Sequence, residues 1–189
     1  MKREIEVKIE VPDADQVARR LEALGATLVV PRSFEDNRLF DLADLALARA
    51  GRLLRLRICN GRGILTGKGP APADAATSAY KVRTEEEAEV TDVEGLVKAL
   101  AAAGLEARWR YQKWRREYRL AGASVVVDEI PHGTFVEIEA EPGVIDDVAA
   151  RLGFDRSAYL TFTYREIHEQ RCARTPPGDM VFESPGGAP

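Results

Sequence analysis

The sequence predicts an α+β fold: a closed eight-stranded antiparallel β-barrel that forms a tunnel, with helices packed on the outside. Charged and apolar residues alternate in several short segments, which is typical of strands, because side chains two apart share a face. About eight such segments, mostly joined by short turns, favour an antiparallel sheet that closes on itself. The charged face would then line the tunnel, and helices between the strands would cover the apolar outer faces.

The first strand is predicted over residues 2–11. Its two faces differ, with charged residues on one and apolar residues on the other: Glu4, Glu6 and Lys8, against Ile5, Val7, Ile9 and Val11. Pro12 and Asp13 then open a helix that runs to Leu24, and Gly25 is its expected C-cap.

Short strands and one strong turn signal follow the first helix. Asn60-Gly61 predicts a tight hairpin. The expected segments are strands near 27–30 and 37–40, a short irregular stretch over 42–50, and hairpin strands over 53–59 and 63–68. Residues 69–79 are rich in Pro, Ala and Gly, so we expect a mobile loop there.

The second half repeats this plan of a strand, a helix and a meander of strands. The expected segments are a strand over 80–90, a helix over 92–104, strands over 107–120, 124–129 and 134–141, and helices over 145–152 and 157–169. Residues 171–189 hold four prolines and three glycines with few apolar side chains, which predicts disorder. We therefore expect one domain over residues 1–170 and a disordered C-terminal tail over 171–189.

Composition excludes several classes of protein. The net charge of −4 over 189 residues argues against a general nucleic-acid binder, which shows a net basic surface. No apolar run approaches 18 residues and no signal pattern opens the chain, so we expect a cytoplasmic protein with no membrane partner. Cys59 and Cys172 are too few and too far apart to predict a disulfide scaffold or a zinc site.

The alternating charges are sorted by sign. Glu4 lies beside Glu6 and Glu137 beside Glu139, whereas arginine and lysine pairs recur elsewhere, as in Leu54-Arg55-Leu56-Arg57. A solvated outer face is the usual meaning of alternation, but like charges on one face repel unless a counter-ion lies between them. Paired carboxylates suit a hard divalent cation, and paired basic groups suit phosphate oxygens. Together the charges predict a site for a metal and a polyphosphate.

Six motifs, in order over about residues 2–168, resemble the CYTH family of triphosphate tunnel metalloenzymes, in particular its class IV adenylyl cyclase-like branch. They are Glu4-x-Glu6-x-Lys8, Leu54-Arg55-Leu56-Arg57, Leu65-Thr66-Gly67-Lys68-Gly69-Pro70, Lys81-x-Arg83-x-Glu85-x-Glu87, Lys113-x-Arg115 and Phe135-Val136-Glu137-Ile138-Glu139. Phe40-Asp41 and Asp128-Glu129 add to the resemblance to that branch.

The resemblance implies roles for these residues and a cofactor, Mg²⁺ or Mn²⁺. The metal-binding acids would be Glu4, Glu6, Glu137 and Glu139. Phosphate oxygens would be held by Lys8, Arg55, Arg57, Lys68, Lys81, Arg83, Lys113 and Arg115. Catalytic acids, binding a second metal or orienting water, would be Glu85, Glu87 and Asp128; for Asp128, a purely structural place at a strand end is an equal alternative.

The reaction stays open at this point. The implied partner is a small-molecule triphosphate: ATP, tripolyphosphate or thiamine triphosphate. Class IV adenylyl cyclase chemistry would convert ATP to cyclic AMP and pyrophosphate, and a triphosphatase would hydrolyse the terminal phosphate. A non-catalytic polyphosphate binder would not need the metal-binding acids, and a module without ligand would leave the interior charges unneutralised. A homodimer is compatible with the sequence.

Aromatic residues and histidines have more ordinary expected roles. Trp109 and Trp114 could stack on a base, but aromatic residues in strands more often pack together. We expect Tyr159 and Tyr164 to lie in the core. His132 lies between Pro131 and Gly133, which predicts a turn residue rather than a metal ligand or a base.

Overall fold

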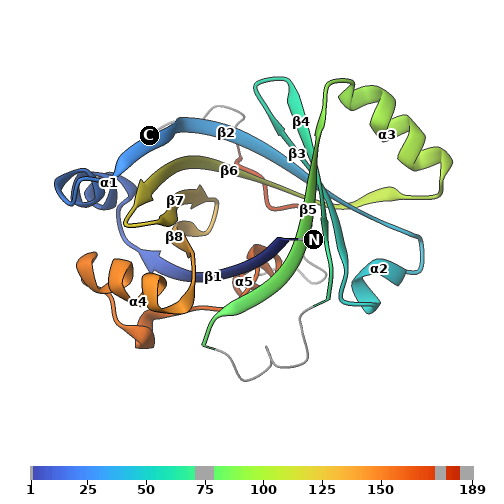
Figure 1. Ribbon diagram of the computed structural model, residues 1–189. Coiled ribbons are helices and arrows are strands. Elements are labelled where there is room, and N and C mark those ends of the chain that lie inside the picture. Colours follow the sequence, from blue (N-terminus) through green and yellow to red (C-terminus); the bar gives the residue numbers. More distant parts are fainter. Residues whose placement is uncertain (1, 71–78, 173–177, 184–189) are drawn as a thin grey trace.

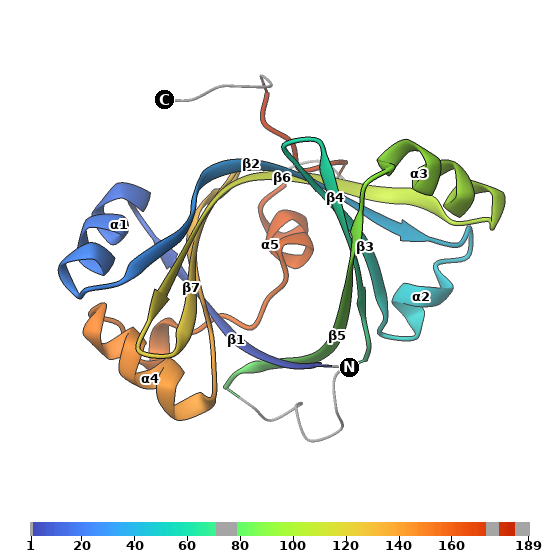
Figure 2. The same ribbon diagram turned by 45° about the horizontal axis from the view of Figure 1, so that its top comes forward.

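The computed structural model describes residues 2–70, 79–172 and 178–183. Within these residues, eight antiparallel strands close into a barrel in the order β1-β5-β4-β3-β2-β6-β7-β8, which confirms the predicted fold. Figure 2 looks into the ring of strands. The strands are β1 (Lys2–Val11), β2 (Thr27–Asp41), β3 (Leu53–Cys59), β4 (Arg62–Lys68), β5 (Lys81–Val90), β6 (Glu106–Leu120), β7 (Ala123–Ile130) and β8 (Gly133–Glu139).

The helices surround the barrel. They are α1 (Ala14–Ala23), α2 (Ala46–Arg49), α3 (Val93–Ala102), α4 (Pro142–Arg151) and α5 (Tyr164–Arg171). Helices α1 and α4 lie on one side and α2 and α3 on the opposite side, whereas α5 is seen through the ring of strands (Figures 1 and 2). No helix among the described residues is long and apolar enough to cross a membrane.

The main hydrophobic core lies outside the barrel, between the strands and the helices α1 and α4. Ile5, Val7 and Ile9 of β1 are at most 5% exposed and belong to one buried cluster with Leu21 of α1 and Ile145 of α4. Because neighbouring residues of a strand point to opposite faces, burying this apolar row turns the charged row of β1 into the barrel. The outward apolar packing thus positions the interior charges.

Two local structures, a helix N-terminus and a hairpin turn, formed where the sequence predicted them. The side chain of Asp13 caps α1, since it accepts hydrogen bonds from the backbone N–H groups of Asp15 and Gln16 at 2.8 and 3.1 Å. Asn60 and Gly61 both have positive φ, 50° and 76°, as the tight hairpin between β3 and β4 requires. This hairpin sets the register that pairs Arg55 with Thr66 across the two strands.

Strand β2 differs from the prediction of two short strands. It runs without interruption over Thr27–Asp41 and pairs with β6 along its length, with a register shift between Val30 and Ser33. Pro31 lies at this irregularity, where a missing N–H group does not break a regular ladder. The continuous strand brings residues 31–36 into the barrel wall, where no strand was predicted.

The C-terminal part also differs from the prediction. The helix expected over 157–169 is a 3₁₀ turn at Arg156–Ala158, followed by a segment in which Leu160 bridges to Lys8, and then α5. In the expected disordered tail, residues 178–183 lie along β6, and Met180 is 1% exposed there. The other tail residues beyond 172, and residues 71–78 of the expected loop, lie outside the described residues.

Candidate functional site

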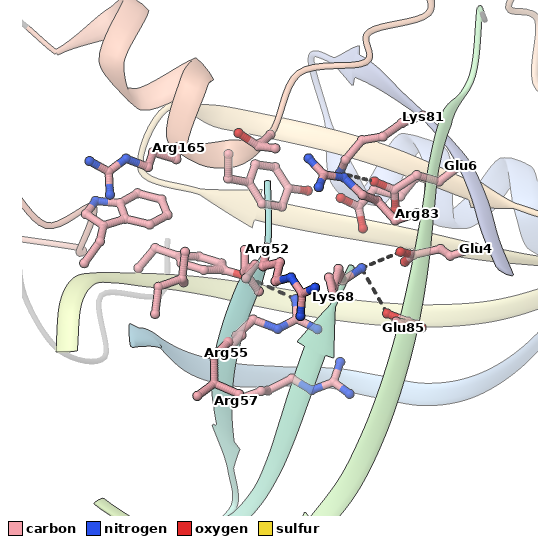
Figure 3. A pocket seen from close by; sticks show the side chains of 18 of the residues that line it. Glu4, Glu6, Arg52, Arg55, Arg57, Lys68, Lys81, Arg83, Glu85 and Arg165 are labelled. Atoms are coloured by element: carbon pink, nitrogen blue, oxygen red, sulfur yellow. Dashed lines mark hydrogen bonds and ion pairs between the residues drawn. The ribbon is translucent and has the colours of Figure 1, made fainter. Parts of the chain in front are cut away.

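A cavity of about 610 Å³ lies inside the barrel and gathers the predicted site residues. Every residue assigned a role from the sequence lines it, except Asp128. Figure 3 shows part of this cavity, with Glu4 and Glu6 on the right and Arg55 and Arg57 in the lower part of the view. Inward-facing residues of β1, β3, β4, β5, β6 and β8 supply these charges, so residues far apart in the sequence share one space.

The acidic residues lie on β1, β8 and β5. Glu6 pairs in register with Glu139 of β8, and Glu4 and Glu6 are 7% and 9% exposed. Glu85 lies opposite Lys2 on β5, beside Glu4. These carboxylates therefore form an acidic cluster of Glu4, Glu6, Glu85, Glu137 and Glu139 on one wall of the cavity.

Lysine ammonium groups lie between the carboxylates of the acidic cluster. The Nζ atom of Lys68 lies 2.5 Å from Glu4 and 3.0 Å from Glu85. Lys81 contacts Glu6 at 2.5 Å, and Lys8 pairs with Glu137 (Figure 3 shows the contacts of Lys68 and Lys81). In this arrangement the lysines act as counter-ions to the acids.

The two neighbouring acids of β1 respond differently to this environment. Burial and the adjacent Glu6 raise the pKa of Glu4, in spite of the contact with Lys68. Burial also opposes ionisation of Glu6, but the charges of Lys81 and Lys8 outweigh it and lower the pKa of that carboxyl. Of these two neighbours, Glu4 is therefore the one whose ionisation the surroundings oppose.

A basic cluster of Arg55, Arg57, Lys113 and Arg115 faces the centre of the cavity from β3 and β6. Arg55 donates to the hydroxyl groups of Tyr111 and Thr66, both at 3.3 Å. Among the described residues, Arg57 makes only longer contacts, 3.6 Å to Glu87 and 3.8 Å to Glu35. Its guanidinium group is thus free to form a bidentate contact with an incoming anion.

Asp128 lies behind the basic cluster, wholly buried, and does not line the cavity. Its carboxylate contacts Lys113 at 2.9 Å, accepts two hydrogen bonds from Arg115 at 2.6 and 2.7 Å, and accepts one from the Tyr164 hydroxyl at 2.8 Å. Burial, Asp128 and Glu137 hold the pKa of Tyr164 well above its usual range, so the phenol remains a donor. Asp128 is therefore placed to orient two cations.

The other predicted catalytic acids do line the cavity. Glu85 contacts Lys68, and Glu87 accepts a hydrogen bond from Thr66 at 2.8 Å. The side chain of Glu87 is 38% exposed and lies 3.7 Å from Arg55. Of the two, Glu87 is the one beside the basic cluster.

Several charged residues at the cavity were given no role from the sequence. Lys2, Asp41, Arg52, Arg108, Glu117, Arg119, Arg165, Glu166 and Glu169 line it, and Glu35 lies behind its wall. Glu35 of β2 is 5% exposed and lies 3.5 Å from Lys113, and Asn37 on the same strand is wholly buried. The alternation Glu35, Asn37, Leu39 was a usable signal, but Pro31 and the mixed composition around it hid the strand.

The aromatic residues mostly pack, as expected. Trp109 stacks on Tyr111 with ring centroids 5.0 Å apart and donates to the Gly178 carbonyl at 3.1 Å. Trp114 packs edge-on against Phe34, with centroids 5.2 Å apart, and does not line the cavity. Tyr164 is buried as expected, yet it also lines the cavity.

The donor chemistry of the acidic cluster fits a hard divalent cation. Its ligands would be carboxylate oxygens alone, the type that Mg²⁺ and Mn²⁺ prefer. The described residues contain no group of three acids, histidines or cysteines already arranged around one point, because Lys68 and Lys81 lie between the carboxylates. A bound cation would add positive charge beside Glu4 and would compete with Lys68 and Lys81 for these carboxylates.

Comparisons with known proteins agree with this geometry. The CYTH domain model matches residues 2–152. A Methanocaldococcus jannaschii protein named as a candidate adenylate cyclase, MJ0240, is 25% identical over 137 residues, which cover 72% of this chain and 75% of that protein.

Two solved structures show the same fold. A candidate adenylate cyclase from Vibrio parahaemolyticus superposes with a TM-score of 0.75 at 19% identity, over 87% of this chain and 96% of that one. The protein HpAC1 from Hippeastrum superposes with a TM-score of 0.58 at 21% identity, over 82% of this chain and 89% of that one. With the family match over most of its length, the chain belongs to the CYTH domain family.

Proposed function

We propose that this protein is a divalent-metal-dependent enzyme that acts on a triphosphate-bearing substrate inside the barrel. One observation carries the proposal: the acidic cluster and the basic cluster line a single cavity, where Arg115 and Glu137 lie 2.8 Å apart. A chain of phosphates is the ligand that would use both, because the basic groups would neutralise its oxygens and the acids would hold a cation that adds further positive charge. A simple anion site would not need the acids.

The chain's own residues would bind and orient the phosphates. Arg57 and Arg55 would hold phosphate oxygens from β3, and Lys113 and Arg115 would do so from β6, where Asp128 fixes their direction. Their charge would stabilise the negative charge that develops on the leaving group. A cation held by Glu4, Glu6, Glu137 and Glu139 would supply Lewis-acid polarisation of the phosphate oxygens.

Cyclisation of ATP is the first candidate reaction, and the names of the relatives from Methanocaldococcus jannaschii and Vibrio parahaemolyticus support it. The ribose 3′-oxygen would form a bond to the α-phosphorus, and the bond from that phosphorus to the bridging oxygen would break. Pyrophosphate would leave, and the 3′-hydroxyl proton would pass to a base. Glu87, the more exposed of the cavity acids beside the basic cluster, is our candidate for that base.

Hydrolysis of a triphosphate is the second candidate. The Hippeastrum relative is described as having a dominant triphosphatase activity. In this chain one face of the Trp109 ring packs against Tyr111 and the residue is only 6% exposed, which leaves little of the ring for stacking on a base. Water would attack the terminal phosphorus, and a diphosphate would leave.

One experiment separates these candidates. The purified protein is incubated with ATP, tripolyphosphate or thiamine triphosphate, each with Mg²⁺ or Mn²⁺, and the products are identified by chromatography. Cyclic AMP with pyrophosphate supports the cyclase, and orthophosphate supports the triphosphatase. Tight binding of tripolyphosphate without any turnover would overturn the enzymatic proposal in favour of a polyphosphate-binding protein.

A further inference from the structure

Glu35 lies one layer behind the cations of the cavity. It is 5% exposed and does not line the cavity, so Arg57 and Lys113 stand between it and any ligand. Its oxygens lie 3.8 Å from Arg57 and 3.5 Å from Lys113, and Oε2 has no hydrogen-bond partner in the described part of the chain. Glu35 therefore acts on these cations through its charge rather than through directed hydrogen bonds.

The carboxylate of Glu35 is ionised at neutral pH. Burial alone would raise its pKa, but Lys113, Arg115, Arg57 and Arg55 together lower the pKa to about 2. One fixed negative charge is thus held among the four members of the basic cluster. In the barrel interior such a charge is poorly screened by solvent.

The neighbouring acids each reach only part of the basic cluster. Glu87 lies 3.6 Å from Arg57 and 3.7 Å from Arg55, and Glu137 pairs with Arg115. Asp128 forms hydrogen bonds with Lys113 and Arg115, and it contacts neither Arg57 nor Arg55. Asn37, two residues along β2 from Glu35, is a neutral amide whose side-chain nitrogen and oxygen find no hydrogen-bond partner among residues 2–70, 79–172 and 178–183. Glu35 is therefore the buried counter-charge shared by Arg57 on one strand and Lys113 on another.

We propose that Glu35 weakens the hold of the basic cluster on polyphosphate, and so lets the product leave the tunnel. A fixed anion beside the same cations opposes a second anion that binds them. This inference rests on the proposed function, in which ATP cyclisation and tripolyphosphate hydrolysis both leave pyrophosphate in the cavity. Glu35 would act through Arg57 and Lys113, without touching the substrate.

The test measures the affinity for tripolyphosphate and pyrophosphate by calorimetry in the wild type, Glu35→Gln and Asp36→Asn. Asp36 is the matched control, because it is the next residue of β2 and pairs with Arg110, which does not line the cavity. We expect Glu35→Gln to bind both anions about tenfold more tightly. In steady-state assays its KM and kcat should both fall, and Asp36→Asn should match the wild type.

The outcomes separate this inference from the proposed function. A wild type that binds no triphosphate overturns the proposed function. If the wild type binds triphosphate and Glu35→Gln binds it equally well or more weakly, the proposed role of Glu35 is wrong. A purely structural residue would weaken binding when changed. Glu35→Asp provides a second variant if the glutamine variant folds poorly: it retains the charge one methylene farther from the cations. Its affinity should lie between those expected for the wild type and Glu35→Gln, and an affinity no tighter than that of the wild type contradicts the proposal.

Discussion

The ammonium group of Lys113 lies 2.9 Å from the carboxylate of Asp128, and their side chains are only 1% and 0% exposed. The ion pair is therefore almost wholly shielded from solvent. The same carboxylate also binds Arg115, so one buried acid fixes two cations that point into the cavity. The preorganisation of the basic cluster on β6 depends on this acid.

Replacing Asp128 by asparagine should destabilise the protein strongly. Removing one partner of a buried pair leaves uncompensated charge, which costs about 3–5 kcal/mol of unfolding free energy. Glu129→Gln is the control, since the adjacent Glu129 pairs with Arg32, and their side chains are 21% and 25% exposed. Urea unfolding measures both variants. An Asp128→Asn variant as stable as Glu129→Gln would mean that Asp128 does not anchor the cations.

Arg57→Ala should weaken tripolyphosphate binding far more than Arg19→Ala. The Arg57 side chain is 17% exposed and faces the cavity, whereas Arg19 is exposed on α1. Loss of a desolvated charged contact costs on the order of 2–5 kcal/mol of binding free energy, and loss of a solvated arginine costs little. Isothermal titration calorimetry measures both. Equal dissociation constants would place the phosphate site elsewhere.

Activity should require an added divalent cation, and Glu4→Gln or Glu137→Gln should abolish it. Both residues belong to the acidic cluster, whose oxygens are the ligands such a cation prefers. Glu10→Gln should keep full activity, because Glu10 lies on the same strand as Glu4 but pairs with Arg171 outside the cavity. Turnover that persists in excess EDTA would disprove the metal requirement.

Acid should destabilise the protein partly through Glu35. Its pKa is about 2 in the folded protein and 4.5 as a free side chain, so the ionised form stabilises the fold. That contribution, about 3 kcal/mol, is complete above about pH 4.5, falls as the pH drops toward 2, and is absent below it. The difference in unfolding free energy between the wild type and Glu35→Gln should shrink over this range. A difference that is constant with pH would contradict the assignment.

The barrel and most of the candidate site could be predicted from sequence because strand periodicity is strict. In Glu4-Ile5-Glu6-Val7-Lys8 the charged residues face inward because Ile5 and Val7, on the opposite face of the strand, are buried under helices. Local rules of this kind need no knowledge of which strands are neighbours.

Features that depend on strand order could not be predicted. Lys68 meets Glu4 only because β5 lies between β4 and β1, and Glu35 meets Arg57 only because β2 pairs with β3. Likewise Asp128 has the alternation of an inner-face residue, yet Lys113 and Arg115 cover it. Tertiary neighbours thus decide which charges reach the cavity and which stand behind it.

The central claim is that the cavity binds a chain of phosphates. The most direct measurement is a thermal unfolding titration with Mg²⁺ and either tripolyphosphate or orthophosphate at equal concentration. A ligand at one hundred times its dissociation constant stabilises the fold by about 2.7 kcal/mol. Tripolyphosphate should raise the melting temperature well above the effect of orthophosphate, because only a chain reaches both the β3 and the β6 members of the basic cluster. Equal shifts with the two anions would contradict the claim.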